Sequence, residues 1–196
     1  MTDEALASAS VEDLFADAGA LLEGHFLLKS GRHAGRYLEK FLVLQHPRFG
    51  VEVCRRLAEA LGPHEPSLIV GPTTGGVLLS FETARQLGGS VRAAFAEPLP
   101  SGGRALRRGW PLGADERVAI VDDILTTGTS LLETVEAVRA AGAEPVASAV
   151  IVDRSGGLFD LGLPLAALGT LDIPSWEPAD CALCASGVPL RKPGSS

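Results

Sequence analysis

The sequence contains little lysine and cysteine and has no long apolar run, and each shortage excludes a class of protein. Only three of the 196 residues are lysines, Lys29, Lys40 and Lys192. None of them follows a glycine-rich loop, so the chain lacks the G-x-x-x-x-G-K-[ST] site for nucleoside triphosphates. Three cysteines are too few, and odd in number, for a disulfide framework. No apolar run approaches the roughly 18 residues of a membrane span, and the start M-T-D-E is unlike a signal peptide. We therefore expect a cytoplasmic protein that does not bind membranes.

Composition and charge narrow the class further. Hydrophobic residues make up 46% of the chain and charged residues 21%, which is typical of a compact folded protein. A length of 196 residues predicts one domain with a sizeable core. The net charge of −7 argues against a nucleic-acid partner, because a nucleic-acid footprint needs a basic surface.

The most informative stretch is R-V-A-I-V-D-D-I-L-T-T-G-T-S at 117–130. Its apolar residues 118–121 predict a buried parallel strand, and Asp122 and Asp123 follow where that strand should end. A turn of hydroxyl residues and one glycine comes next, and apolar spacing then predicts a helix over 130–141.

Each part of this stretch has a chemical interpretation. Backbone N–H groups of a tight Thr/Gly turn at a helix N-terminus bind anions such as phosphate. Two carboxylates would repel a phosphate but suit a sugar diol or a hard cation. The alternative is that two acids simply end a strand before a helix cap. The acidic pair and the hydroxyl-rich turn occur together in the expected order. The sequence therefore favours a ligand with a phosphate, a ribose and a metal-bound diphosphate.

The remaining pattern predicts an α/β fold. Strands are expected at 68–70, 91–95, 118–121 and 146–152, and helices from Pro47, over 76–87 and over 130–141. Alternating strands and helices indicate a parallel sheet covered on both faces. A helical pattern over 4–22 and two strand-like runs around residues 30–31 precede it, and the chain after 155 is Pro-rich and irregular.

Some twenty residues between the strands at 91–95 and 118–121 show no apolar periodicity. They carry Arg104, Arg107 and Arg108 next to a Gly-Gly pair. A segment of this length in a compact domain is usually functional or disordered. We favour a mobile cationic lid over a solvated hairpin.

The stretch V-A-I-V-D-D-I-L-T-T-G-T-S closely resembles the phosphoribosyl-diphosphate (PRPP) motif of type I phosphoribosyltransferases. The resemblance implies a central parallel sheet flanked by helices, with a small hood made from the N- and C-terminal segments. It implies a single domain over 1–196, with a core of about 47–155, a hood of about 20–46 and 156–196, and a lid of about 97–113. It also implies that Asp122 and Asp123 hold the ribose hydroxyls and that 126–130 binds the 5′-phosphate.

Two further segments resemble orotate phosphoribosyltransferases: H-F-L-L-K-S-G-R at 25–32 with Tyr37, and V-D-R at 152–154. The tail from Cys181 also resembles a bacterial and archaeal branch of that family. The implied orotate contacts are Tyr37, Leu38, Thr126 and Arg154, with the arginine pairing with the carboxylate. The implied PRPP contacts are Lys29, Asp122, Asp123, Ile124, Leu125, Thr126, Thr127, Gly128, Thr129 and Ser130.

The implied reaction joins the ribose 5-phosphate of PRPP to orotate, in de novo pyrimidine biosynthesis. Mg²⁺ would enter on the diphosphate, with no direct protein ligand expected beyond Asp122 and Asp123, and the enzyme would be a homodimer. Two alternatives stay open: a type I transferase for a purine or uracil, and a PRPP-binding regulator without catalysis.

The chain departs from the family pattern at two places. The lid of the family usually supplies a catalytic lysine and often a histidine, yet 96–110 contains neither. We expect Arg104 to act in their place, since an arginine also offsets diphosphate charge. The family's G-P-A-x-K-G loop reads G-P-T-T-G-G here, with Gly75 in the place of the lysine.

Cysteines and histidines outside these motifs receive no function. Cys181 and Cys184 have the spacing of half a zinc site, but a closed structural site needs four ligands. Neither a second pair nor a nearby histidine is evident in the sequence, so we expect two reduced thiols. His33 lies close to the expected base pocket, and a surface role is favoured for it.

Overall fold

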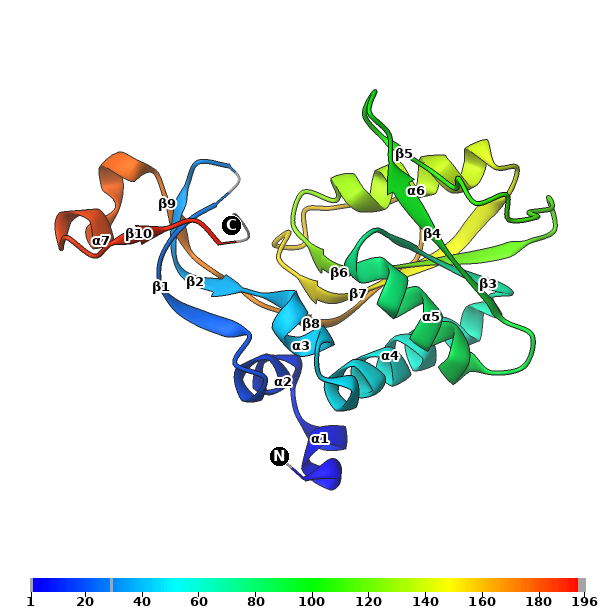
Figure 1. The fold of residues 1–196 in the computed structure, drawn as a ribbon, viewed down its shortest axis with the longest axis horizontal. Helices are drawn as coiled ribbons and strands as arrows, with labels where there is room; N and C mark the ends of the chain where they lie inside the picture. Colours follow the sequence, from blue (N-terminus) through cyan, green and yellow to red (C-terminus); the bar gives the residue numbers. More distant parts are fainter. Residues whose placement is uncertain (1, 29, 194–196) are drawn as a thin grey trace.

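The computed structural model describes residues 2–28 and 30–193 and divides them between two β-sheets (Figure 1). A six-stranded sheet with helices on both faces forms the core. A four-stranded sheet forms a smaller hood beside it, from segments near both ends of the chain. The predicted fold class, a parallel sheet with flanking helices and a hood, is confirmed.

The core sheet contains β3 (Leu68–Pro72), β4 (Arg92–Pro98), β5 (Arg104–Ala105), β6 (Arg117–Leu125), β7 (Glu144–Asp153) and β8 (Leu165–Thr170). Their order is β5-β4-β3-β6-β7-β8, and all neighbours are parallel except β4 and β5. β8 corrects the expected boundary, because the core reaches Thr170 and does not end near 155. The sequence concealed this edge strand because most of its side chains are only half-buried and its apolar pattern is weak.

Helices cover both faces of this sheet. α4 (Pro47–Leu61) and α5 (Gly75–Leu87) pack on one face, and α6 (Thr129–Ala140) packs on the other. Along β6, Ala119 and Val121 belong to the cluster on the α4 and α5 side, while Val118 and Ile120 face α6. Burial on both sides explains the continuous apolar run, since each buried aliphatic side chain contributes about 1.5–3 kcal/mol.

Two short helices, α1 (Asp3–Ser8) and α2 (Val11–Asp17), replace the single helical stretch expected over 4–22. Ser10 interrupts the helix as the N-cap of α2, where its hydroxyl accepts from the Asp13 N–H and the Asp13 carboxylate accepts in return. Serine at this position favours a new helix start over continuation of the old one.

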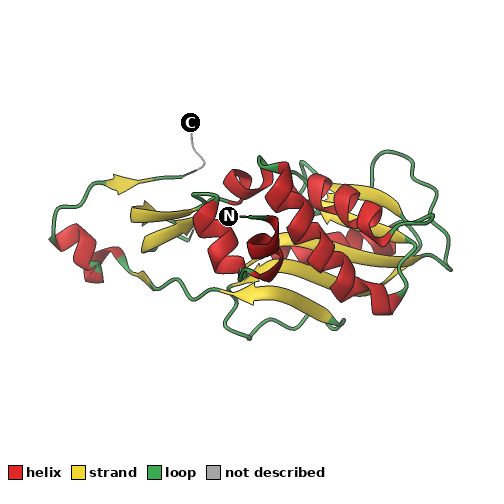
Figure 2. Ribbon diagram, turned by 90° about the horizontal axis from the view of Figure 1, so that it is seen from below, coloured by secondary structure: helices red, strands yellow, loops and turns green. Residues whose placement is uncertain are grey.

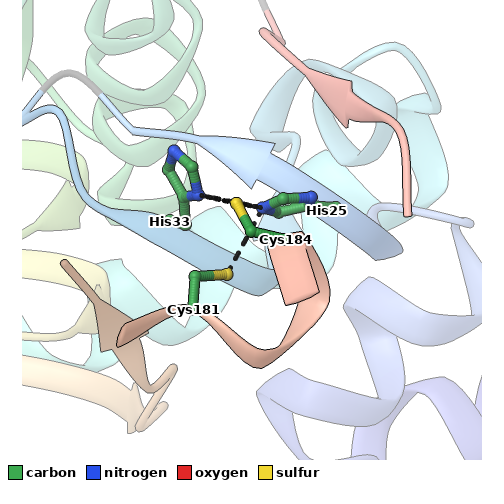
Figure 3. Close-up of side chains that lie close together, drawn as sticks. All are labelled: His25, His33, Cys181 and Cys184. Atoms are coloured by element: carbon green, nitrogen blue, oxygen red, sulfur yellow. Dashed lines mark hydrogen bonds between the residues drawn. The ribbon is translucent and has the colours of Figure 1, made fainter. Parts of the chain in front are cut away.

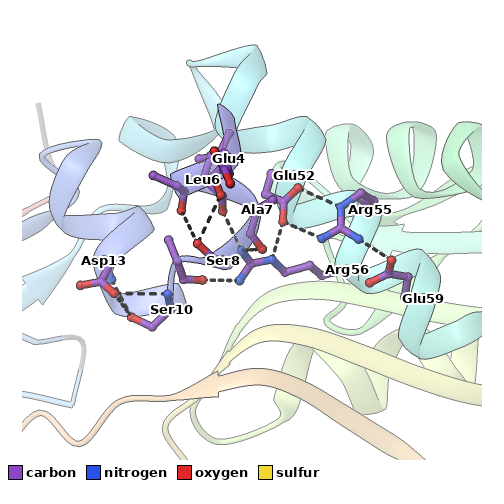
Figure 4. A network of polar contacts seen from close by, with 12 residues as sticks. Glu4, Leu6, Ala7, Ser8, Ser10, Asp13, Glu52, Arg55, Arg56 and Glu59 are labelled. Atoms are coloured by element: carbon purple, nitrogen blue, oxygen red, sulfur yellow. Dashed lines mark hydrogen bonds and ion pairs between the residues drawn. The ribbon is translucent and has the colours of Figure 1, made fainter. Parts of the chain in front are cut away.

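Arg56 of α4 ties this N-terminal segment to the core (Figure 4). Its guanidinium donates to the carbonyl oxygens of Ala9 at 2.7 Å and Leu6 at 2.9 Å, and its Nε donates to Glu52 at 2.7 Å. The Leu6 carbonyl otherwise accepts only a long bond from the Ala9 N–H, at 3.4 Å, so the arginine helps to satisfy the carbonyl groups at the end of α1.

The hood sheet contains β1 (Leu21–Leu27), β2 (His33–Leu38), β9 (Ser175–Trp176) and β10 (Leu190–Arg191), in the order β10-β1-β2-β9. The predicted strand pair around residues 30–31 corresponds to β1 and β2, which are antiparallel. His33 is buried, with 5% of its surface exposed, which corrects the surface role expected for it.

Shorter elements complete the chain: α3 (Lys40–Leu44) after the hood, η1 (Gly62–His64) after α4, and η2 (Pro178–Asp180) and α7 (Ala182–Ala185) between β9 and β10. The segment that carries α7 extends away from the core (Figure 2). Among the described residues, none of the helices combines the length and the apolar character that crossing a bilayer requires.

Candidate active site

The acidic pair lies at the carboxyl end of β6, next to the middle of the sheet. β6 continues to Leu125, beyond the expected end at residue 121, because Asp122 and Ile124 keep their pairing with β7. Asp122 and Asp123 are therefore inside the strand and are buried, with 5% and 4% of their surfaces exposed. The carboxyl end of a parallel sheet is where ligands bind in open α/β folds.

All four oxygens of the pair have partners in the chain. Asp122 accepts from Ser130 Oγ at 2.5 Å and from the Asp123 N–H at 2.8 Å. Asp123 accepts from the Ile124 N–H at 2.8 Å and pairs with Lys40 Nζ at 2.7 Å. These partners orient the carboxylates and offset part of the cost of burying two negative charges.

Burial and the neighbouring charge of Asp123 raise the pKa of Asp122 to about 6. The hydrogen bonds from Ser130 and from the Asp123 N–H oppose this rise, because they stabilise the ionised form. A titrating carboxyl with a raised pKa at a ligand edge is a mark of a functional site.

The loop after β6 is the segment predicted to bind an anion. Thr126, Thr127 and Thr129 are exposed, and Gly128 has a φ of +75° at the N-cap of α6. A Cβ atom at Gly128 would lie 1.8 Å from the ring of Phe159, so only glycine fits there. The loop lines a cavity of about 330 Å³ together with Arg104, Ser130, Ile124 and Glu133.

Arg104 lies between the phosphate loop and the 71–76 loop. Its Nε is 3.2 Å from Glu133 Oε2, and its Nη1 donates to the carbonyl oxygens of Thr73 at 3.4 Å and Ala96 at 3.3 Å. These bonds are long, and the Glu133 contact lacks hydrogen-bond geometry, since Nε is unsatisfied among the described residues. The guanidinium is therefore held loosely beside the cavity.

The segment predicted to be a lid is a hairpin in this structure. β4 and β5 pair in antiparallel fashion, and the turn closes with a 2.9 Å bond from the Leu99 N–H to the Gly103 carbonyl. Arg108 pairs with Glu97 at 2.6 Å, and Arg107 is exposed. The segment therefore has the hairpin form that the sequence analysis held as the alternative. Whether the hairpin moves as a lid stays a prediction.

A second cavity, of about 500 Å³, lies at the end of β7 and β8. It is lined by Asp153, Arg154, Ser155, Gly156, Gly157, Thr170, Leu171 and Asp172. Arg154 Nε is buried and has no hydrogen-bond partner among the described residues, and burial lowers the pKa of this arginine. A half-buried cation with a buried, unused N–H donor fits an anionic ligand group.

Tyr37 brings the hood to this cavity. Burial raises the pKa of Tyr37, and the charges of Arg154 and Asp123 both act on it, so the three groups are neighbours. Leu38 does not join them, because its side chain points into the main core and is 4% exposed. The expected stacking role of Leu38 is therefore corrected, and Tyr37 is the only aromatic side chain of that pair.

Other predicted contacts divide into three groups. Thr126, Thr127, Gly128, Thr129 and Ser130 line the cavity of about 330 Å³, and their contact with the 5′-phosphate stays a prediction. Leu125 packs its side chain in the core, so only its backbone is available to a ligand. Lys29 lies outside the described residues.

Two residues of the site were missed. Lys40, one of three lysines in the chain, pairs with Asp123. A Cβ atom at Gly75 would lie 2.5 Å from Asp123 Oδ2, so the carboxylate occupies the space that a lysine side chain would need. The rarity of lysine was the available signal for Lys40, but its partner follows only from the fold.

A parallel sheet that ends in a buried acidic pair and a hydroxyl-lined anion loop, with a hood beside it, defines the phosphoribosyltransferase class. Residues 43–161 match the family described as Phosphoribosyl transferase domain.

Whole-chain relatives are more specific. The orotate phosphoribosyltransferase of Pelotomaculum thermopropionicum is 46% identical over 182 residues, which cover 93% of this chain and 94% of that protein. The Thermotoga maritima enzyme is 42% identical over 94% of this chain and 97% of its own length. A crystal structure of orotate phosphoribosyltransferase from Aeropyrum pernix has a TM-score of 0.69 at 27% identity, over 82% of this chain and 93% of that one. The chain belongs to the orotate phosphoribosyltransferase family, as its motifs predicted.

The raised pKa of Asp122 makes a prediction about stability. A carboxyl whose pKa is higher in the folded than in the unfolded state loses stability as the pH rises from about 4 to about 6, because the folded state binds the proton more tightly. Asp122→Asn removes that loss and should raise the free energy of unfolding at pH 7 by about 1–3 kcal/mol, at about 1.4 kcal/mol for each pKa unit. Thermal and denaturant unfolding at several pH values measure the difference.

The gain should shrink as the pH falls through about 6 and should be lost below about pH 3, where the wild-type carboxyl is protonated in both the folded and the unfolded state. Asp115→Asn, which changes an exposed carboxyl, is the matched control and should alter stability little at any pH. If the free energy of unfolding of Asp122→Asn at pH 7 were equal to or below that of the wild type, the hydrogen bonds to Asp122 would fully offset the cost of burying its charge.

Proposed function

We propose that this protein transfers the ribose 5-phosphate of PRPP to a ring nitrogen of orotate and releases diphosphate. The observation that carries the proposal is the half-buried Arg154 guanidinium, which lines a cavity and whose buried Nε has no hydrogen-bond partner among the described residues. The membership of the family supports the same substrates.

In this proposal PRPP lies along the carboxyl end of β6. The 5′-phosphate accepts hydrogen bonds from the N–H and hydroxyl groups of 126–130 at the start of α6. The ribose hydroxyls donate to Asp122 and Asp123, which are already oriented by Ser130 and Lys40. Lys29 is expected to contact PRPP, because the segment 25–32 that contains it resembles the matching segment of the family.

Catalysis would be mainly electrostatic. The sugar develops positive charge as the diphosphate leaves, and the two carboxylates lie where they stabilise that charge. Arg104 lines the adjoining cavity and would offset negative charge on the leaving group.

Mg²⁺ fits this arrangement as a companion of the diphosphate. Each carboxylate oxygen of the pair already accepts a hydrogen bond or an ion pair, so the chain leaves these residues little capacity to hold the ion alone. When bound, the ion would neutralise diphosphate charge. Asp122 and Asp123 are the residues that would hold such an ion, and Arg104 would act on the diphosphate and not on the ion.

Orotate would bind between the hood and the end of β7. Its carboxylate would pair with Arg154, and its ring would stack on Tyr37, which also contacts Phe26 with ring centroids 5.7 Å apart. Thr126 would touch the base from the phosphate loop. We further propose a cytoplasmic location for the protein.

We also propose that the active form is a homodimer that covers the α4 and α5 face. Phe81 and Leu78 of α5 are 67% and 52% exposed, and Val51 of α4 is 40% exposed. These residues line one apolar groove of about 360 Å³. Large exposed apolar side chains that gather in one place mark an interface, and a second copy has the same groove to offer.

The first prediction here concerns the base. Orotate differs from uracil by one carboxylate, and a desolvated arginine–carboxylate pair contributes on the order of 2–4 kcal/mol. Arg154→Ala should therefore lower kcat/KM for orotate by about 30- to 1,000-fold, with little change in the KM for PRPP. Turnover of orotate and uracil is measured side by side with saturating PRPP and Mg²⁺.

Arg154→Lys is the control, because it keeps the charge but loses the bidentate geometry, and it should recover part of the activity. An unchanged ratio of orotate to uracil in Arg154→Ala would assign carboxylate recognition to another residue.

The second prediction concerns the cation beside the phosphate loop. Arg104→Ala should lower kcat by about 10- to 1,000-fold, the range for loss of one electrostatic group at the transition state. Arg107→Ala removes an equal charge from the same segment, but from an exposed side chain, and should lower kcat by less than about 3-fold. Steady-state kinetics of both variants test the assignment, and equal effects would remove the special role of Arg104.

The third prediction concerns the dimer. Phe81→Glu places a charge in the apolar groove and should shift the protein from dimer to monomer in sedimentation equilibrium. Leu132→Glu changes a residue with 43% exposure on α6, on the opposite face, and should leave the dimer intact. A dimer that persists in Phe81→Glu would place the interface elsewhere.

A further inference from the structure

Four side chains with metal-binding atoms gather in the hood, outside the active site (Figure 3). His25 comes from β1, His33 from β2, Cys181 from the N-cap of α7 and Cys184 from α7 itself. One ligand atom from each residue lies within 4.8 Å of all the others. The histidines that the sequence did not reveal beside Cys181 and Cys184 are thus supplied by the fold, which overturns our expectation of two isolated thiols.

We propose that His25, His33, Cys181 and Cys184 bind a structural Zn²⁺ ion in a closed tetrahedral site. Two thiolates and two imidazoles are one of the ligand sets of structural zinc, and soft sulfur ligands favour this metal over Mg²⁺ or Ca²⁺.

The distances agree with a tetrahedron around one ion. With zinc bonds of about 2.0–2.1 Å to nitrogen and about 2.3 Å to sulfur, the edges of the tetrahedron are about 3.3–3.8 Å long. His25 Nε2 lies 3.0 Å from His33 Nδ1 and 3.4 Å from Cys181 Sγ. Cys184 Sγ lies 3.3 Å from His33 Nδ1 and 3.7 Å from His25 Nε2. To admit the ion, the shortest edge must lengthen by a few tenths of an ångström, and the longest separation in the cluster, up to 4.8 Å, must shorten by about 1 Å.

The hydrogen bonding of His25 prepares its ring for a metal. His25 Nδ1 is 2.8 Å from the carbonyl oxygen of Val188, which only accepts, so Nδ1 must carry the proton. In the neutral ring, the lone pair of Nε2 then points toward His33 and the two cysteines. A backbone carbonyl that fixes the tautomer in this way is the usual outer partner of a zinc-binding histidine.

The surrounding segment has a physical need for such an ion. Between residues 174 and 193 the structure buries only Cys181, so this part of the chain has almost no apolar core. β9 and β10 hold it by strands of two residues each. A metal that joins this segment to β1 and β2 supplies the stability that burial cannot, as in other small metal-bound folds.

The site also bears on the hood as a whole. His33 and Tyr37 are four residues apart on β2, so an ion that fixes one end of this strand also restrains the strand that carries Tyr37. The zinc proposal itself does not depend on the proposed substrates, since it rests on the four ligands alone.

Metal analysis of the reduced, purified protein tests the proposal. Inductively coupled plasma mass spectrometry should find about one zinc per chain after purification without chelators. Cys181→Ser with Cys184→Ser should reduce this to below about a tenth, because thiolates provide half of the ligands. Cys54→Ala is the matched control: it removes a buried thiol in α4, outside the cluster, and should keep the zinc.

A second pair of variants guards against loss of metal through misfolding. His33→Ala should lose the zinc, while His33→Cys should retain it, because Nδ1 lies close to the backbone and a cysteine sulfur reaches a similar place and also binds zinc. Circular dichroism of each variant checks that the core remains folded.

Cobalt provides an independent readout in the wild-type protein. Addition of Co²⁺ to the metal-free, reduced chain should produce the visible bands of a tetrahedral site and a thiolate-to-cobalt charge-transfer band. These bands should disappear on addition of Zn²⁺ and should be absent from the double cysteine variant. Removal of zinc by a chelator should lower the Tm and increase hydrogen exchange in 174–193.

Three results would overturn the proposal. One is a protein that contains no stoichiometric zinc and produces no cobalt bands. Another is a disulfide between Cys181 and Cys184 in the native protein, detected by thiol counting and mass. The third is zinc that remains bound in the double cysteine variant, because the ion would then lie at another site.

Discussion

The active site depends on the burial of two adjacent carboxylates at the end of the central strand. Asp122 and Asp123 are almost completely removed from water, and this burial, together with the charge of Asp123, raises the pKa of Asp122. Ser130, two backbone N–H groups and Lys40 compensate for this charge. The neighbouring loop must leave room for Asp123, and therefore position 75 has no side chain. The acidic pair thus constrains three neighbouring segments: α3 through Lys40, α6 through Ser130 and the 71–76 loop through Gly75.

Two cavities lie near the acidic pair, and each is lined by one arginine. Arg104 faces the phosphate loop from the β4–β5 hairpin, and Arg154 faces the cavity at the end of β7. Both guanidinium groups keep an unsatisfied Nε among the described residues, although both lie beside acidic side chains. Preorganised donors of this kind cost stability without ligand and gain their partners when an anion binds. Lys40 pairs with Asp123 of the acidic pair, and the cations that line the two cavities are arginines.

The hood poses a different problem, because it is too small to stabilise itself by apolar burial. Its two central strands, β1 and β2, pair with each other along most of their length. In contrast, the segment 174–193, which carries α7, buries only Cys181 among its side chains. The cluster of two histidines and two cysteines lies where that weakness is greatest. Coordination of an ion would join segments near the two ends of the chain, at the opposite end of β2 from Tyr37.

The sequence by itself determined the features that lie close together along the chain. Strand, acidic pair, anion loop and helix occupy 117–130, so local periodicity and turn chemistry were enough to predict the main site and the parallel sheet. Only the tertiary structure decided which distant groups meet. It moved Leu38 into the core, placed Lys40 on Asp123, and brought His25 and Cys181, 156 residues apart, within 3.4 Å. Contacts between residues so far apart depend on how the strands pair and on which face of a sheet each side chain occupies. The residues that separate the two partners in the sequence carry no pattern that reveals either of these features.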